Sequence, residues 1–445
     1  MTTQSNEKKV RDTDPFVSAF ASRRAEGPGW LDAFRQQGIN RFATQGFPTL
    51  QDEDWRFTNV AAITRLPFKP APAAALEAIP SGLLPFGGVE TDLLVFVDGR
   101  FASHLSKVGS VTEGAFVGPL SQALETPGLD LDQSLGNHVT GAENAFAALN
   151  AAYFVDGGVV IVPRGKSLER PVQLCFISTG SVAGGASSPR TWIRVGDGAS
   201  ATVVETFVGM GRAAYLTNAV TEAVVGDSGV LEHLRFQDDA AEAFHVGTMH
   251  YHLGRASRCW GHSLAMGARL SRVNIRASLA GEGLEAVLNG LYLTRGEQLA
   301  DHHMVVDHQR PHCASHEYFN GILDERSKGV FHGRILVQQE AQKTDAKQTN
   351  KNLLLSDDAT VDTKPQLEIY ADDVKCTHGA TVGQMNEDSI FYLRARGIGL
   401  ERARRMLMHA FAGEITERIQ HEGLREQLDR LVWDRLEQNP HVKAG

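Results

Sequence analysis

Short apolar runs separated by turn residues fill the middle of the chain. From Thr91 onward, segments such as DLLVFVDG, GVVIVPRG and TWIRVGDG are rich in β-branched residues and are bounded by Gly, Asp or Pro, which is the pattern of strands. Between about residues 230 and 385, helical periodicity is almost absent. The pattern therefore predicts a mainly β core over residues 91–385.

Similar phrases recur within this core. LNGLYLT, FNGILDE and FHGRILV follow one another, and the step from Asn289 to Asn320 is 31 residues, close to one or two turns of a coil of stacked strands. Each coil leaves unpaired backbone edges until the next coil stacks on it, so the ends of the stack need covers. A β-solenoid explains the recurrence better than a sandwich does, although strand content alone fits both folds.

Helical periodicity is confined to the two ends of the chain. Residues 1–90 are predicted to form an N-terminal helical region and connector, and residues 386–445 a C-terminal helical domain. There, NEDSIFYLRARG predicts an N-capped helix closed by Gly397. Two further helices are expected with apolar stripes, at Leu400, Ala403, Leu407, Phe411 and Ile415, and at Leu424, Leu428, Leu431 and Leu436. These terminal helices are the expected covers for the coil ends.

Composition excludes several classes of function. Lys and Arg number 44 against 53 Asp and Glu, a formal charge of -9, which argues against nucleic acid as a partner. The N-terminus has no apolar leader and no stretch of about 18 apolar residues follows, so we predict a cytoplasmic protein with no membrane association. Four widely spaced cysteines suggest neither a disulfide framework nor a zinc knuckle. Nucleotide-binding glycine loops and the familiar hydrolase motifs are absent.

Cys376 and His378 stand two positions apart in the strand-like stretch VKCTHGATVGQ. Residues i and i+2 of a strand point to the same face, roughly 7 Å apart, so the pair could hold one soft or borderline metal. Two ligands do not complete a zinc or iron–sulfur site, and the others would have to come from elsewhere or from another chain. The alternative is a buried thiol beside a hydrogen-bonded imidazole.

Two further polar stretches allow a plain and a sharper interpretation. The first contains His302, His303, His308, His312, Cys313 and His316. Pro311 forbids a helical ligand stripe there, so we expect hydrogen bonds across strands and loops. The alternative, a cupin-like metal enzyme, lacks the usual His-x-His and Glu spacing.

The second stretch, residues 341–355, carries Gln342, Lys343, Asp345, Gln348 and Asn350. It predicts polar ladders on the exterior of the coil or, alternatively, a surface between subunits.

Several long phrases resemble the SufB/SufD family of scaffold subunits of the SUF iron–sulfur cluster assembly machinery. They are EDWRFT, VDHQRPHCASHEYFNGILD, VFHGRILV, AQKTDAKQTNKNLLLS, LEIYADDVKCTHGATVG and FYLRARGIGLERARRMLMHAFAGEI. Within the family, the glycine at position 379 and the alanine at position 359 favour the SufD branch. The resemblance implies a right-handed parallel β-helix flanked by N-terminal and C-terminal helical regions.

The same resemblance implies partners and site residues. A SufB-like paralogue is expected to pair with the end of the β-helix, where Cys376 and His378 would share a nascent iron–sulfur cluster with a Cys and a Glu of that partner. A SufC-like ATPase is expected on the C-terminal helices, which explains why this chain binds no nucleotide. The expected contacts are Leu393, Arg394, Arg396, Gly397, Ile398, Arg404, Met406 and Leu407. Reduced flavin is associated with the family complex, and the free edge also allows a homodimer.

Three functions therefore remain open from the sequence. The chain could be a non-catalytic scaffold subunit that contributes cluster ligands, or a purely structural brace for the SufB-like partner in which Cys376 and His378 only pack. The third and least favoured is a carbohydrate-active β-helix enzyme.

Overall fold

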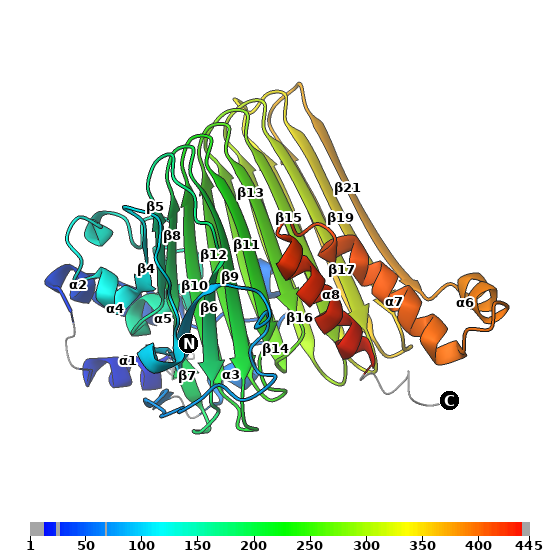
Figure 1. Ribbon diagram of the computed structural model, residues 1–445, viewed down its shortest axis with the longest axis horizontal. Helices are drawn as coiled ribbons and strands as arrows, with labels where there is room; N and C mark the ends of the chain where they lie inside the picture. The colour runs from blue at the N-terminus through cyan, green and yellow to red at the C-terminus, as the bar shows by residue number, and fades with distance from the viewer. Residues whose placement is uncertain (1–12, 24–26, 67–68, 438–445) are drawn as a thin grey trace, which may run out of the picture.

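Two parallel sheets wind together into a solenoid (Figure 1). The computed structural model describes residues 13–23, 27–66 and 69–437. One sheet runs, in spatial order, through β20 (Thr360–Ile369), β18 (Lys328–Val337), β16 (Leu299–His308), β14 (Leu270–Leu279), β12 (Phe244–Leu253), β10 (Leu216–Val225), β8 (Arg190–Val195), β5 (Gly158–Val162) and β4 (Phe116–Pro119), with β7 (Gly185–Ser187) and β1 (Lys69–Pro70) beside β10. The other runs through β21 (Lys375–Gln384), β19 (Asp345–Leu354), β17 (Ala314–Leu323), β15 (Glu285–Thr294), β13 (Arg258–Ala265), β11 (Val230–Asp238), β9 (Ser200–Gly209), β6 (Val172–Ser178), β2 (Asp92–Val97) and β3 (Arg100–Phe101).

Successive coils stack in register. Asp345 of β19 pairs with Lys375 of β21, so one coil of two strands takes 30 residues at this point. Asn289, however, pairs with Tyr318 rather than with Asn320, so the recurring phrases lie two positions out of register. The predicted solenoid is confirmed and the sandwich is wrong, although the repeated asparagine marks the length of a coil only approximately.

The N-terminal region packs on the outer face of the sheet that contains β5, β8, β10 and β12, near one end of the solenoid (Figure 1). Its helical elements are α1 (Asp14–Ala21), α2 (Gly29–Gln45), η1 (Glu53–Trp55), α3 (Ala61–Thr64), η2 (Ser103–Leu105), α4 (Leu120–Ala123), η3 (Leu131–Gln133) and α5 (Ala145–Tyr153). Helix α5 falls inside the segment predicted as the β core. Its Ala-rich sequence is capped by Asn144, whose side chain accepts a hydrogen bond from the Ala147 amide, and it packs against α2 in a shared apolar cluster.

A buried ion pair ties this region to the first coils. The Arg190 guanidinium lies 2.6 Å from the Glu222 carboxylate, and both side chains are 0% exposed. Glu222 also accepts hydrogen bonds from the backbone amides of Gly136, His138 and Val139. The pair therefore connects β8 and β10 to the loop that leads into α5.

Three helices follow the solenoid: α6 (Glu387–Arg394), α7 (Leu400–Thr416) and α8 (Glu422–Glu437). The predicted cap is confirmed, because the Asn386 side chain accepts a hydrogen bond from the Ser389 amide, and Gly397 has a φ of +83°. The predicted stripes are confirmed at Ala403, Ile415, Leu424, Leu428 and Leu436, and the predicted Phe411 and Leu431 are half-buried against the same cluster. The buried residues include Ala403, Met408, Ala412 and Ile415 on α7, and Leu424, Leu428, Val432 and Leu436 on α8.

These helices do not cover the end of the solenoid, contrary to expectation. Helices α7 and α8 pack on the outer face of the sheet that contains β15 and β17, in an apolar cluster with Leu291, Ile322 and Leu353. An amphipathic helix buries its apolar face wherever a complementary surface exists, and here that surface is the side of the stack. Figure 1 shows β21 at the outer end with no helix laid over it.

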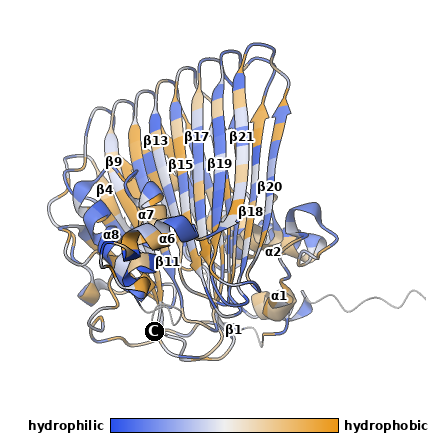
Figure 2. Ribbon diagram, turned by 90° about the vertical axis from the view of Figure 1, so that its right-hand side faces the viewer, coloured by the Kyte–Doolittle hydropathy of each residue, from blue (hydrophilic) through white to orange (hydrophobic). Residues whose placement is uncertain are grey.

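The last coil is consequently open. Strands β20 and β21 are the terminal strands of their sheets, and they expose Ile369 and Val382, while Tyr370 just beyond β20 is also exposed. Figure 2 faces this end and shows polar and apolar residues alternating along the outer strands. An uncovered parallel edge of this length is a ready template for another strand.

Candidate functional site

Strand β21 presents a row of backbone amides to the open edge. The amide of Lys375 donates to the Thr344 carbonyl at 2.8 Å, so in this parallel ladder every second residue bonds back to β19. The alternate amides, which include those of Cys376, His378 and Ala380, point away from β19. No strand lies beyond β21 in the described parts of the chain.

The neighbouring edge is interrupted by a proline. On β20 the amide of Thr360 donates to the Ser327 carbonyl. The amides of the odd-numbered residues of β20 therefore point away from β18. Pro365 is one of these residues and has no amide to donate. Strand β21 therefore offers the continuous donor row, while β20 is partly blunted as an edge.

Cys376 lies at this edge with its side chain on the inner face of the coil. It is half-buried and packs against an apolar cluster that includes Ile335 and Ala371. Burial, aided by the nearby Asp345 carboxylate, raises the pKa of the thiol above its usual range. The thiol is therefore protonated at neutral pH, and binding of a metal or of persulfide sulfur must displace its proton.

His378 is on the same face of β21 but is exposed. It continues a column of inward polar residues, because Gln348 pairs with His378 and Glu317 pairs with Gln348. Glu317 and Gln348 are 0% and 1% exposed. Burial raises the pKa of Glu317 to about 8, with the Ser315 hydroxyl opposing the shift. A neutral carboxyl and an amide therefore stand directly behind His378.

Glu317 and Gln348 were not predicted from the sequence to be neighbours of this site. Residues 341–355 were expected to display polar ladders on the exterior, whereas Gln348 and Asn350 are buried inside the coil. Strand β19 carries polar residues on both faces, so its sequence pattern does not show which face points into the coil. Only the register of three successive strands brings Glu317, Gln348 and His378 into one column.

Cys376 and His378 belong to no group of three potential metal ligands within the described residues. Both side chains lie on one face of the edge strand β21. A metal or cluster held here needs ligands from a partner.

The predicted ATPase contacts lie at the far end of the C-terminal helices. Leu393 and Arg394 end α6, Gly397 forms the following turn, and Arg404, Met406 and Leu407 are half-buried on α7. The prediction omitted the two most exposed large hydrophobic side chains near them. Phe391 is 74% and Tyr392 55% exposed. The adjacent aromatics in SIFYLRAR were the available signal.

The histidine-rich stretch is not a ligand stripe. His308 ends β16 and bonds to the Ser315 hydroxyl at 2.9 Å, while His312 sits in a turn with a φ of +60°. His302 bonds across the coil to Ser263. The predicted hydrogen bonds across strands and loops are confirmed for His302 and His308.

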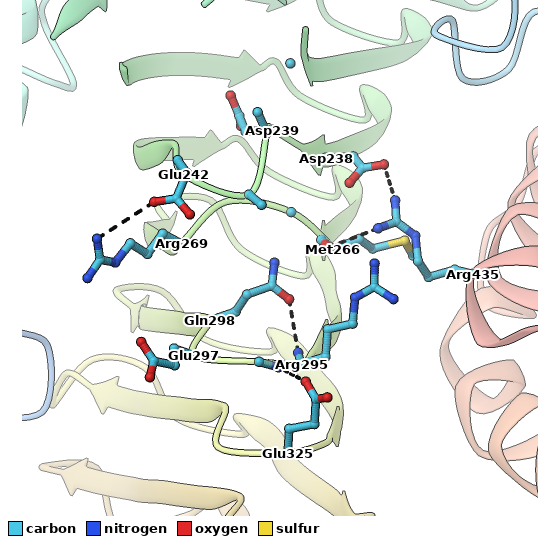
Figure 3. A pocket seen from close by; sticks show the side chains of 15 residues that line it. Asp238, Asp239, Glu242, Met266, Arg269, Arg295, Glu297, Gln298, Glu325 and Arg435 are labelled. Atoms are coloured by element: carbon cyan, nitrogen blue, oxygen red, sulfur yellow. Dashed lines mark hydrogen bonds and ion pairs between the residues drawn. The ribbon is translucent and has the colours of Figure 1, made fainter. Parts of the chain in front are cut away.

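A large open cleft lies where the strand turns approach α8 (Figure 3). Its volume is about 820 Å³, and charged side chains line it. Several of these charges are paired, Asp238 with Arg435 and Glu242 with Arg269. Among the described residues, no His or Cys side chain lines the cleft, and we assign no chemistry to it.

The structure is a parallel β-solenoid with an open last coil, and the outermost strand carries a thiol and an imidazole on one face. Two family models match the chain: the SUF system FeS cluster assembly, SufBD core domain, over residues 176–411, and the SufBD protein N-terminal region, over residues 21–174. The chain belongs to the SufBD family of iron–sulfur cluster assembly proteins.

Individual relatives agree with this assignment. The iron–sulfur cluster assembly protein SufD of Escherichia coli is 33% identical, covering 90% of this chain and 92% of the relative. A SufBD family protein of Synechocystis sp. is 31% identical, covering 89% of each. SufD of Bacillus subtilis is 24% identical, covering 95% of this chain and 98% of the relative. The resemblance inferred from the sequence phrases is confirmed. In the described residues, no helix has the length and apolar character needed to span a membrane.

Proposed function

We propose that this chain is a non-catalytic scaffold subunit of a cytoplasmic SUF complex, in which it helps to build and transfer a nascent iron–sulfur cluster. The observation that carries the proposal is the open last coil, where Cys376 and His378 share one face of the outermost strand. Family membership supports a role in cluster assembly. Iron accepts both thiolate and imidazole ligands.

The partner at this edge is proposed to be a SufB-like paralogue. It would continue the ladder beyond β21 and supply the ligands that this chain lacks. Exposed Tyr370 and Val382 would be buried in the same contact, as apolar residues at an interface core are. Reduced flavin stays a prediction for the complex, without an assigned contact on this chain. A homodimer through the same edge is expected only when the paralogue is absent.

His378→Ala is expected to lower cluster yield in the reconstituted complex by about 10-fold, the scale seen when metal coordination is impaired. Cys376→Ser should act similarly, since a hydroxyl is a poor ligand for iron. The measurement is the visible absorbance and the iron and sulfide content after anaerobic reconstitution. Thr377→Ala is the matched control, because Thr377 is exposed on the opposite face of β21.

The competing interpretation is a structural brace in which the pair only packs. It predicts full cluster content in both variants while the complex still assembles. That result would show that Cys376 and His378 are not cluster ligands. The proposed pairing of subunits would be unaffected. The family assignment gives no support to a carbohydrate-active enzyme.

A SufC-like ATPase is proposed to dock on α6 and the start of α7, so that its ATP-driven motion reaches the scaffold. The predicted contacts begin at Leu393, directly after the exposed pair Phe391 and Tyr392. The Arg396 guanidinium lies over the Tyr392 ring, 3.4 Å from its centroid. Aromatic and arginine side chains of this kind often dominate binding energy.

Replacing both Phe391 and Tyr392 with serine is expected to weaken binding of the ATPase subunit by about 2 kcal/mol, roughly 30-fold in Kd. Binding would be measured by calorimetry or interferometry with the purified ATPase subunit. Val155→Ser, an exposed hydrophobic in the N-terminal region, is the control. Unchanged affinity in the double variant would contradict the docking assignment.

A further inference from the structure

Three potential metal ligands from distant parts of the chain meet on the outer face of the sheet that ends in β20, whereas Cys376 and His378 lie on the other sheet. Asp54 lies in η1, His303 on β16 and His332 on β18. One ligand atom from each lies within 4.8 Å of the other two. His303 and His332 are paired in register on adjacent strands, so the sheet itself holds the two imidazoles together.

The Asp54 carboxylate lies on the η1 turn, which buried contacts hold in place. Trp55, next to Asp54, is 5% exposed and stacks on Phe146 with centroids 5.4 Å apart. The Arg272 guanidinium lies 3.7 Å from the Trp55 ring centroid and donates to the backbone carbonyl of Asp54. The turn is therefore positioned by contacts that leave the Asp54 carboxylate available.

His303 is unsatisfied as the structure stands. It is 8% exposed, and its Nδ1 is buried without a hydrogen-bond partner among the described residues. Its Nε2 lies 3.7 Å from the Asp54 Oδ1, too far for a hydrogen bond. Two ligands of one ion, each at about 2.1 Å from it, are separated by roughly 3–3.5 Å. The observed gap is thus closer to the spacing around a shared ion than to direct contact.

The imidazole of His332 is oriented by a hydrogen bond to the neighbouring strand. His332 Nε2 lies 2.6 Å from the Gln366 amide oxygen. In the tautomer that donates this hydrogen bond, Nδ1 carries the lone pair. An outer hydrogen bond of this kind is the usual companion of a ligating histidine.

The cations around the site each have a carboxylate of their own. Arg272 pairs with Asp301, Lys364 with Glu53 and Arg334 with Glu368. These cations therefore do not neutralise the negative charge of the Asp54 carboxylate. A cavity of about 180 Å³, lined by both Asp54 and His303, adjoins the ligands and has room for water in the remaining coordination positions.

We propose that Asp54, His303 and His332 bind one divalent transition-metal ion of the borderline class that includes Zn²⁺, Co²⁺ and Fe²⁺. Two imidazoles and one carboxylate suit these ions better than Mg²⁺ or Ca²⁺. The ion would fasten the η1 turn to β16 and β18, and so the N-terminal region to the solenoid. This site is independent of Cys376 and His378 and of the proposed role in cluster assembly.

The test is a titration of the tag-free full chain with Co²⁺ after chelator treatment, followed by visible absorbance and by thermal unfolding. The parent protein carries Cys376→Ser and His378→Ala, so that binding at the open edge does not contribute. We expect one equivalent of Co²⁺ bound with nitrogen and oxygen ligation, and a rise in the unfolding temperature. Asp54→Asn should weaken binding at least about 10-fold, and His332→Gln by more.

Asp54→Asn is the deciding variant, because the Asp54 side chain is 59% exposed and its loss leaves the backbone contact to Arg272 in place. Asp372→Asn, an exposed carboxylate beyond β20, is the control and should bind as the parent does. Absence of Co²⁺ binding by the parent, or equal affinity in the parent and in Asp54→Asn, would overturn the proposal. Neither outcome bears on cluster yield at Cys376 and His378.

Discussion

Ala380→Pro in β21 is expected to weaken pairing with the SufB-like paralogue on the order of 100-fold. The Ala380 amide points away from β19, and proline removes that donor while placing a ring where the added strand must approach. The substitution copies Pro365, which already occupies an outward position on β20. We therefore expect β21 to keep its ladder with β19.

Affinity would be measured with the purified paralogue, and folding of the variant by thermal unfolding. Ala380→Ser retains the amide and is the matched control, with affinity close to that of the wild type. Gly379→Pro is the informative contrast. Its amide is in the set that bonds to β19, so this variant should lose stability as well as affinity. If Ala380→Pro bound as tightly as Ala380→Ser, the partner would not add a strand to β21.

Arg190→Ala is expected to lower the free energy of unfolding by about 3–5 kcal/mol, because it leaves the Glu222 carboxylate buried without its cationic partner. Glu222 would keep its three backbone donors, which places the expected loss within this range rather than above it. The loop before α5 should loosen at the same time. Urea unfolding followed by circular dichroism measures the effect.

Arg255→Ala is the control for that experiment. Arg255 pairs with Asp227 at 3.3 Å, but the two side chains are 65% and 47% exposed, and surface pairs of this kind contribute about 0–1 kcal/mol. Equal losses in the two variants would mean that the buried pair does not hold the N-terminal region to the solenoid.

The fold class was readable from the sequence because each coil repeats the same physical requirement, a short apolar run followed by a turn. The register was not readable, since Asn289 and Asn320 look equivalent and yet lie in different columns. Helical periodicity located α7 and α8, but the period does not say which surface the apolar stripe meets. That surface is the side of the stack, and it buries Met408 and Val432 fully, whereas the predicted Leu407 and Leu431 are half-buried.

Part of the candidate site could likewise be predicted from the sequence, and part could not. Cys376 and His378 could be placed on one face because they are two residues apart in a strand. Glu317 joins them only through two successive strand pairings, and Gln348 was misplaced because polar residues occupy both faces of β19. Asp54 and His303 are 249 positions apart, and only the packing of η1 on the sheet brings them together.

In the proposed complex, a partner strand continues the solenoid at β21. The most direct test of this pairing is hydrogen–deuterium exchange of the peptide covering residues 375–384, in the isolated chain and with the SufB-like paralogue bound. We predict that the outward amides of β21 exchange measurably more slowly in the complex, while exchange in β9, buried within the stack, stays unchanged. A stable complex in which exchange of residues 375–384 is unaltered would contradict this pairing.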